Sequence, residues 1–497
     1  MYFDRFIQSF GTAGKRALHL SPLMATGIMV AGCTASEQKD SVPNIIFILS
    51  DDHSAPFASC YGDKNVQTPN IDRLAKEGIL FRHAYTTAPQ SVPSRAGLMT
   101  GRSTVDVRMT RFSAPLPANI VAFPELLRKA GYHTGICGRS FHLDGARNPP
   151  ESETVFQEYH LRTFEKRVDY LRQGGSKDAL PQLREFLNTA PKEKPFFIQV
   201  GFSEPHRIFD AFDFEPDPAT LQLPVGMPDI PELRKDLAGY YGEIQRLDVY
   251  IGQLLDELDQ RGLAENTLVV FIGDNGGALL RGKGTLNDLG IHVPLLARWP
   301  KGIQPGQISD ALISGEDIAP TFLEVAGYPV PEEITGKSFV PAFTDNLFSA
   351  HAFVFAERGA HGGGLPQGSA AFDLGRTVFS KEYKLIYNAL WQLPYEPVDF
   401  SGQPFWKKLK DLHGNGKLDP LYSRLFFAGQ RPIFELYDRV NDPYELNNLA
   451  GNPDYAEQEH ALKAELQKWM ILNQDFLPLP VPPGNRNGQN VIKKNVY

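Results

Sequence analysis

Two pairs of oxygen-bearing side chains each stand at the end of an apolar run. Asp51 and Asp52 follow one run directly, and Asp274 and Asn275 follow a later one. If the two runs are neighbouring parallel strands, their carboxyl ends bring these four groups to the edge of the sheet where ligands collect. Three carboxylates and an amide oxygen suit Ca²⁺ or Mg²⁺ better than Zn²⁺. The alternative is that each pair forms a turn or a helix cap, as Asp and Asn often do.

Ser91 and Arg95 form a second chemical cluster. Pro93 in a first helical turn and Gly101 as a stop predict a short helix. Ser91 then stands just before the helix N-terminus, where free N–H groups and the helix dipole attract anions. A hydroxyl-derived nucleophile beside an anion site is suited to phosphoryl or sulfuryl transfer. The alternative is an N-capping serine on a structural helix.

The elements that position these residues alternate between strands and helices. Continuous apolar runs predict buried strands at 44–50, 195–200 and 267–272, and more weakly at 294–299. Helical spacing and caps predict helices at 68–78, 123–131 and 232–263. This order predicts an α/β fold with a mainly parallel sheet sandwiched by helices. We assign residues 43–340 to this catalytic domain.

The pattern changes after residue 340. A strand or hairpin is predicted at 378–388, a short strand at 434–438 and a terminal helix at 455–472. Residues 341–480 therefore form a smaller C-terminal α+β domain with an antiparallel sheet, and 481–497 form a tail.

The first residues resemble a bacterial lipoprotein signal. Lys15 and Arg16 precede a mostly apolar stretch that ends in Val-Ala-Gly-Cys33. This predicts loss of residues 1–32, lipidation of Cys33, a tether over 33–42, and membrane attachment in the bacterial envelope, in the periplasm or at the cell surface. The alternative is an ordinary secretory signal with an incidental cysteine.

The net charge bears on the class of binding partner, and the cysteine content bears on disulfide bonds. The net charge of −8 argues against a nucleic-acid partner, yet a local cluster can still hold one anion. Cys60 and Cys137 do not make a disulfide framework. They either pair or stay as two independent buried thiols, and the second interpretation is favoured.

The run Ser-X-Pro-Ser-Arg-X-X-X-Met-Thr-Gly, starting at Ser91, resembles the serine form of the signature of type I sulfatases, in the alkaline phosphatase superfamily. The resemblance extends over roughly 43–480 and includes the segments 43–52, 68–75, 271–276, 435–438 and 441–449. It implies an alkaline phosphatase-like fold and a sulfuric ester hydrolase. It also implies one Ca²⁺ and a formylglycine (3-oxoalanine) made from Ser91 by a serine-type maturase.

The resemblance also assigns a ligand set. Asp51, Asp52, Asp274 and Asn275 are similar to the family's calcium ligands, with the matured Ser91 as a further ligand. Arg95, in the same motif, resembles the residue that holds the formylglycine hydrate.

Further roles follow from three other segments. Arg139 stands where a Lys is common, with one extra residue before His142; the charge is kept, but a planar guanidinium makes different contacts. His142 resembles the base that collapses the intermediate, and His206 and Lys283 resemble sulfate contacts. Asp288 stands where Glu is more usual and receives no role. The alternatives are hydrogen-bonded core histidines and, for Lys283, a solvated surface charge.

The substrate implied is a sulfated carbohydrate, such as an algal polysaccharide or a glycosaminoglycan. The resemblance is nearest to the branch with heparan N-sulfatases, so both sulfate-ester and sulfamidase activity stay open. Five aromatic side chains either stack on sugar rings or pack the smaller domain: Trp391, Tyr395, Phe400, Phe405 and Trp406. A phosphatase or phosphonate monoester hydrolase is the enzymatic alternative, and a glycan-binding surface lipoprotein is the non-enzymatic one.

Overall fold

The computed structural model describes residues 42–480 apart from 113–114, 145–150, 346 and 362–367. The predicted signal peptide, the predicted lipidation site Cys33 and the predicted tail lie outside the described residues. Within them, we find no helix with the length and apolar character that crossing a bilayer requires.

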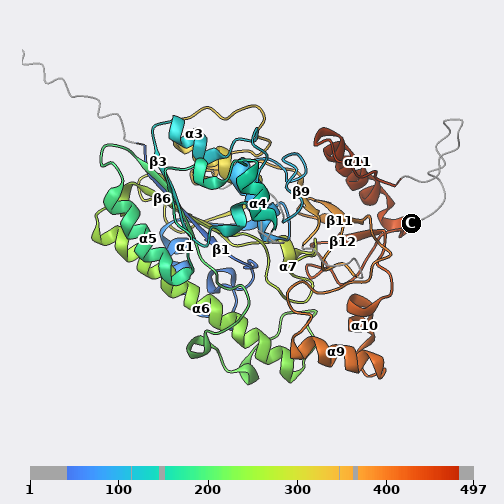
Figure 1. Ribbon diagram of the computed structural model, residues 1–497. Coiled ribbons are helices and arrows are strands. Elements are labelled where there is room, and N and C mark those ends of the chain that lie inside the picture. The colour runs from blue at the N-terminus through green and yellow to red at the C-terminus, as the bar shows by residue number, and fades with distance from the viewer. Residues whose placement is uncertain (1–41, 113–114, 145–150, 346, 362–367, 481–497) are drawn as a thin grey trace, which may run out of the picture. The chain divides into compact units, whose positions relative to one another are not determined.

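The larger sheet has eight strands in the order β4-β3-β5-β1-β6-β7-β2-β8, and Figure 1 labels three of them, β1, β3 and β6. Its pairs are parallel except those that β7 makes with β6 and β2, so the predicted mainly parallel sheet is confirmed. In chain order the strands are β1 Asn44–Ser50, β2 Ile79–Tyr85, β3 His133–Gly138, β4 Tyr170–Leu171, β5 Phe196–Gly201, β6 Thr267–Gly273, β7 Leu295–Arg298 and β8 Gln307–Ser314.

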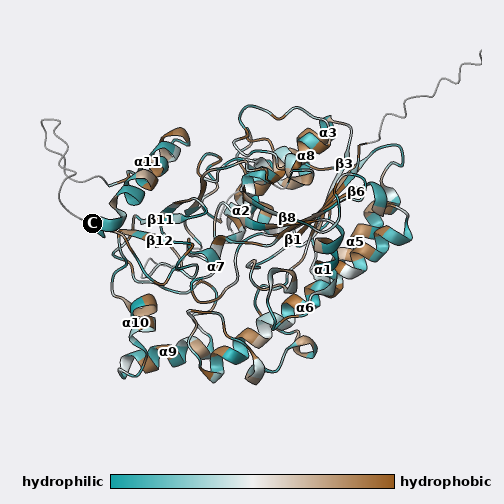
Figure 2. Ribbon diagram, turned by 180° about the vertical axis from the view of Figure 1, so that it is seen from behind, coloured by the Kyte–Doolittle hydropathy of each residue, from teal (hydrophilic) through white to brown (hydrophobic). Residues whose placement is uncertain are grey.

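Helices cover both faces of this sheet. Successive side chains along a strand point to opposite faces, so a strand that is apolar throughout has an apolar surface to bury on each face. Ile45 and Phe47 of β1 pack with residues of α2 Ser91–Thr100, α3 Phe123–Lys129 and α8 Ile318–Val325. Ile46 and Ile48 pack with α1 Pro69–Glu77, α5 Ser176–Thr189 and α6 Pro231–Gln260. Figure 2 shows both brown and teal residues along α5 and α6, as expected for helices with one face on the core.

A second sheet lies in the C-terminal part of the chain. Its four antiparallel strands have the order β12-β11-β10-β9, and β10 and β11 form the predicted hairpin. The strands are β9 Val354–Arg358, β10 Gly375–Phe379, β11 Tyr383–Asn388 and β12 Phe434–Asp438. The remaining helices are α4 Glu151–Glu158, α7 Asp288–Ile291, α9 Pro404–Gly414, α10 Pro420–Phe427 and α11 Ala456–Leu472, the predicted terminal helix.

Cys60 and Cys137 are free, as the favoured interpretation predicted, but only Cys137 is buried and Cys60 is half-buried. Cys137 is buried in β3, and burial raises the pKa values of both thiols.

Candidate active site

The two oxygen-bearing pairs converge because β1 and β6 are parallel neighbours. Ser50 is aligned with Gly273, so the residues that follow each strand emerge at the same edge. Asp51, Asp52, Asp274 and Asn275 are all fully buried there. The backbone N–H of Asp52 donates to Oδ1 of Asp274 at 3.0 Å, and Nδ2 of Asn275 donates to Oδ1 of Asp52 at 2.8 Å. The predicted cluster of four oxygen-bearing side chains is therefore present.

Ser91 is the first residue of α2, and its hydroxyl points at this cluster. Its Oγ lies 3.0 Å from Oδ1 of Asn275 and 3.2 Å from Oδ1 of Asp51. The N-cap residue is Gln90, so the alternative of an N-capping serine is wrong. Gln90 in turn donates from Nε2 to the backbone oxygen of Ala360 at 3.0 Å, which ties the helix start to the chain after β9.

Arg95 lies one turn into α2 and is fully buried. Its Nε donates to Asp274 at 2.9 Å and its Nη2 to Asp51 at 3.0 Å. Burial alone would raise the pKa of Asp51, but the charges of Arg139 and Arg95 lower it well below the usual range. Burial and the Asp51 carboxylate raise the pKa of Asp274 to about 6, although Arg95 opposes the shift.

Arg139 and His142 approach Asp51 from the end of β3. Nε of Arg139 donates to Oδ2 of Asp51, and Nδ1 of His142 lies 3.9 Å from the same oxygen. Burial lowers the pKa of His142 to about 2, against the attraction of Asp51. The imidazole is therefore neutral at physiological pH, and Arg139 occupies the site despite the altered spacing.

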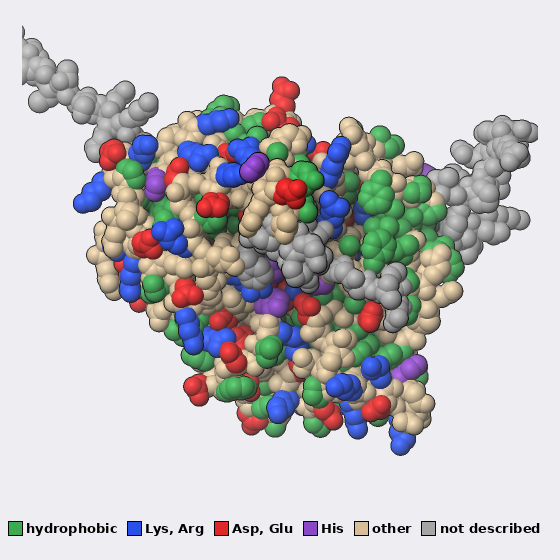
Figure 3. All heavy atoms as spheres, in the orientation of Figure 1, with side chains coloured by type: hydrophobic (Ala, Val, Ile, Leu, Met, Phe, Trp, Pro, Cys, Tyr) green, Lys and Arg blue, Asp and Glu red, His purple; other side chains and the backbone are tan. Residues whose placement is uncertain are grey.

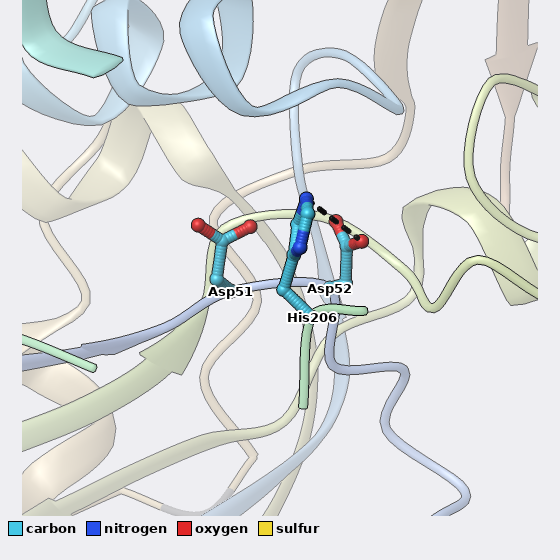
Figure 4. A group of neighbouring side chains, drawn as sticks. All are labelled: Asp51, Asp52 and His206. Atoms are coloured by element: carbon cyan, nitrogen blue, oxygen red, sulfur yellow. Dashed lines mark ion pairs between the residues drawn. The ribbon is translucent and has the colours of Figure 1, made fainter. Parts of the chain in front are cut away.

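Lys283 and His206 both face Asp52. Nζ of Lys283 lies 2.9 Å from Oδ1 of Asp52, and Nε2 of His206 lies 3.8 Å from Oδ2. Figure 4 shows the imidazole of His206 between the carboxylates of Asp51 and Asp52. Lys283 is only 3% exposed, so the alternative of a solvated surface charge is wrong.

Asp399 and His361 join the site without having been predicted. Oδ2 of Asp399 lies 2.7 Å from Nζ of Lys283 and 4.0 Å from Nε2 of His206, and Oδ1 lies 3.7 Å from Nε2 of His361. Burial would raise the pKa of Asp399, but Lys283 lowers it below its usual range. Asp399 stands in an aromatic-rich segment with no local motif, so no sequence signal marks it.

The donor set fits a hard divalent cation. One ligand atom from each of Asp51, Asp52 and His206 lies within 4.8 Å of the others. Asp274, Asn275 and Ser91 add further oxygen atoms at the same edge of the sheet. A set dominated by carboxylate and amide oxygens suits Ca²⁺ or Mg²⁺. Figure 3 shows histidine, acidic and basic side chains gathered around a hollow near the middle of one face.

Most of the aromatic side chains considered for sugar stacking belong to the core instead. Phe400, Phe405 and Trp406 are at most 5% exposed and pack against α6, so the packing alternative holds for them. Tyr395 packs partly on this cluster, and Trp391 lines a cavity.

The chain matches a family model described as "Sulfatase" over residues 43–328. It is 30% identical to an ulvan-active sulfatase from Formosa agariphila over 502 aligned residues, 93% of each chain. It is 29% identical to the human N-sulphoglucosamine sulphohydrolase over 475 residues, 87% of this chain and 90% of that one. The fold is similar to that of a phosphonate monoester hydrolase from Silicibacter pomeroyi, with a TM-score of 0.66 and 20% identity over 87% of this chain and 96% of that one. The chain therefore belongs to the sulfatase family, whose members are sulfuric ester hydrolases of the alkaline phosphatase superfamily.

Proposed function

We propose that the protein removes sulfate groups from sulfated carbohydrates by means of one Ca²⁺ and a formylglycine made from Ser91. The observation that carries this proposal is the position of Ser91. Its hydroxyl stands at a helix N-terminus, within 3.2 Å of Asp51 and Asn275, and Arg95 lies one turn further along the helix. A nucleophile at this position lies next to the free N–H groups of the helix, next to fixed basic side chains and next to a site for a cation, all of which stabilise negative charge.

Ca²⁺ and the formylglycine would supply positive charge and the nucleophile. Asp51, Asp52, Asp274, Asn275 and the oxidised Ser91 would hold Ca²⁺, which offsets negative charge on bound oxygens, while the aldehyde hydrate offers two hydroxyl groups in place of one.

The remaining side chains bind the anion and move protons. Arg95 and Arg139 keep the Asp51 carboxylate in place, and Ser91 contacts the other oxygen of the same carboxylate. Nε2 of His206 and Nζ of Lys283 lie near Asp52 and can donate a proton to the leaving oxygen. The neutral imidazole of His142 can accept a proton from a hydroxyl at position 91.

The charge balance favours a monoanionic group. Four carboxylates, those of Asp51, Asp52, Asp274 and Asp399, face the three cations Arg95, Arg139 and Lys283. A divalent cation would leave one positive charge, which a singly charged sulfate ester neutralises. A phosphate monoester carries nearly two negative charges at neutral pH and would overcompensate.

The relatives support a carbohydrate substrate. One is described as ulvan-active and another as an N-sulphoglucosamine sulphohydrolase, so sulfate esters and N-sulfates are both substrates to test. A phosphonate monoester hydrolase is the second candidate, because that structure shares the fold and a phosphonate monoester also carries a single charge. A purely glycan-binding protein would have no use for the buried charge cluster around Ser91.

The test is the mass of the tryptic peptide 83–95 from protein coexpressed with a serine-type maturase. We expect the loss of two hydrogens at Ser91, or the corresponding hydrate, together with hydrolysis of 4-nitrophenyl sulfate. Active protein with an unmodified Ser91 would contradict the formylglycine proposal. Faster hydrolysis of a phosphonate monoester than of any sulfated sugar would favour the second candidate.

We also propose that the chain is attached to the bacterial envelope through Cys33. A lipid anchor would hold the enzyme where sulfated polysaccharides arrive from outside. The proposal rests on the amino-acid pattern before Cys33.

A further inference from the structure

A cavity of about 600 Å³ lies beside the active site, between the 281–287 loop and the smaller sheet. Its walls include residues of β11, β12 and α10 (Figure 1). The described side chains that line it do not include the carboxylates, Ser91, Arg95 or Lys283 of the active site. The cavity is therefore a separate space, and its volume is in the usual range of ligand sites.

The cavity wall is positively charged although the whole chain is acidic. Four guanidinium groups, those of Arg281, Arg358, Arg424 and Arg431, face two carboxylates, Asp373 and Glu435.

Both carboxylates in the wall are already engaged. Arg431 holds Asp373 through two hydrogen bonds of 2.7 Å, and Glu435 accepts from Asn388 at 2.7 Å. Among the described residues, no carboxylate lies within ion-pair distance of the other three guanidinium groups. The cavity therefore has positive charge that is not compensated within it.

Arg358 gives the strongest indication of a ligand, because it is buried and two of its donor nitrogens are unused. It is 1% exposed, and its Nη2 donates to the backbone oxygens of Ser369 at 2.9 Å and Ala370 at 2.7 Å. Its Nε and Nη1 have no hydrogen-bond partner among the described residues, and neither does Nδ2 of Asn287 in the same wall. Burial lowers the pKa of Arg358 to about 10, so the guanidinium is still charged at neutral pH. Buried donors without partners are costly, which indicates an acceptor that arrives with a ligand.

A thin wall separates this cavity from the active site. Gly284 lines the cavity and follows Lys283 directly in the chain. A Cβ on Gly284 would lie 2.3 Å from the side chain of Val398, the neighbour of Asp399, and 3.7 Å from Nη2 of Arg358. Because Lys283 and Gly284 are consecutive, the active site and the cavity lie on either side of one short stretch of backbone.

We propose that this cavity is a second subsite, which binds an anionic sugar unit next to the sulfated unit that reacts. Arg358 and Arg424 bind the carboxylate or sulfate of that unit, and Trp391 offers an aromatic face to its ring. The inference rests on the proposed function, because it assumes that the substrate is a carbohydrate longer than one unit.

The binding test uses the full chain with Ser91→Ala, so that no probe is turned over. The probes are uronate-bearing, sulfated tetrasaccharides from heparin and from ulvan, with cellotetraose as a neutral control, measured by calorimetry. We expect at least one sulfated probe to bind, and Arg424→Ala, Trp391→Ala and Arg358→Gln each to weaken its binding about tenfold. Arg172→Ala is the matched control, since it removes an equal charge from an exposed pair with Glu185.

Carboxyl-reduced and desulfated probes then show which anion occupies the cavity. Loss of the Arg424 effect with one of them identifies the group and supports the subsite. Binding of neither sulfated probe, or equal binding to the wild type and the Arg424→Ala and Trp391→Ala variants, would overturn the inference.

The activity arm separates this inference from the proposed function. In matured protein, Arg424→Ala and Trp391→Ala should leave kcat/KM for 4-nitrophenyl sulfate unchanged, because that small substrate does not reach the cavity. If the matured wild type hydrolyses neither 4-nitrophenyl sulfate nor a tetrasaccharide, the result counts against the proposed function. If it hydrolyses them and both substitutions leave tetrasaccharide hydrolysis unchanged, the result counts only against the second subsite.

Discussion

Every basic side chain at the active site has a carboxylate within reach before any substrate binds. Arg95 contacts Asp51 and Asp274, Arg139 contacts Asp51, and Lys283 contacts Asp52 and Asp399. Buried charges persist only when they are paired, so these contacts also fix the direction of each donor. The site is thus organised in advance for a small anion.

Replacement of Lys283 by Met tests the effect of the positive charge while the volume of the side chain stays nearly the same. The change keeps the length of the side chain and removes the cation between Asp52 and Asp399. We expect kcat/KM for 4-nitrophenyl sulfate to fall by about 10²–10³, the usual cost of losing one charge-stabilising donor. Lys410→Met on the exposed face of α9 is the control, and a Lys283 variant as active as that control would rule out a role in the reaction.

At the scale of elements, the smaller sheet holds the loop that carries Lys283. Asp288, the first residue of α7, lies 3.1 Å from Nη2 of Arg439 and accepts a hydrogen bond from Nζ of Lys384. Lys384 also lies 2.6 Å from Oε1 of Glu445. Asp288, which received no role from the sequence, therefore fastens the 281–291 loop to β11 and the chain after β12.

Lys384→Met should loosen this attachment. Lys384 is fully buried, and its loss leaves Asp288 and Glu445 without a shared cation. We expect the free energy of unfolding to drop by about 3 kcal/mol in denaturant titrations. Lys468→Met, at an exposed position on α11, should change it by less than about 0.5 kcal/mol. Equal stability of the two variants would contradict the attachment.

Glu316 makes the stability of the 315–325 region depend on pH. Burial raises its pKa to about 7 in the folded protein, from an ordinary value of 4.5. Because the folded state holds this proton more tightly, the stabilisation is fully present below pH 4.5 and is lost as the pH rises through 7. Glu316→Gln keeps an acceptor for Thr335 and cannot ionise, so it should raise the free energy of unfolding at pH 8 by about 2–3 kcal/mol and change it little at pH 4.5. A stabilisation that is larger at the lower pH would have the wrong sign.

At the scale of the whole molecule, cation binding should be coupled to folding. Protein treated with a chelator should melt at a higher temperature after Ca²⁺ is added, because the proposed Ca²⁺ site forms only when the folded chain brings its ligands together. At a hundredfold excess over Kd the gain is about 2.7 kcal/mol, which moves Tm by a few degrees. Asp274→Asn should reduce the shift and the exposed Asp310→Asn should not; equal shifts would place the cation elsewhere.

Membrane attachment can be tested on the same scale. In a bacterial host with lipoprotein processing, the wild type should sediment with membranes, and Cys33→Ala should move the protein to the soluble envelope fraction. Protein that is soluble with either residue would show that the signal is an ordinary secretory one.

Residues 44–50 and 267–272 were predicted as strands from sequence because continuous apolar runs have few other stable arrangements. β2, β3 and β8 were missed because polar side chains interrupt the apolar pattern of each strand. These are Arg82 and His83 in β2, His133 and Thr134 in β3, and Ser309 and Asp310 in β8. The direction of β7, antiparallel within a parallel sheet, was also not predicted, because direction depends on the connection between strands and not on the strand itself.

The sequence by itself determined that the two oxygen-bearing pairs end buried strands and that Ser91 stands at the start of a helix, because each lies in a short segment with a local pattern; that β1 and β6 are neighbours, so that the two pairs meet, came from the tertiary structure. Only the tertiary structure decided that Asp399 pairs with Lys283, that Asp288 fastens the 281–291 loop to β11, and that Arg358 lines a cavity and has donors without partners among the described residues. Those contacts join segments far apart in the chain, and long-range pairing of buried charge leaves no periodic or local pattern from which it can be predicted.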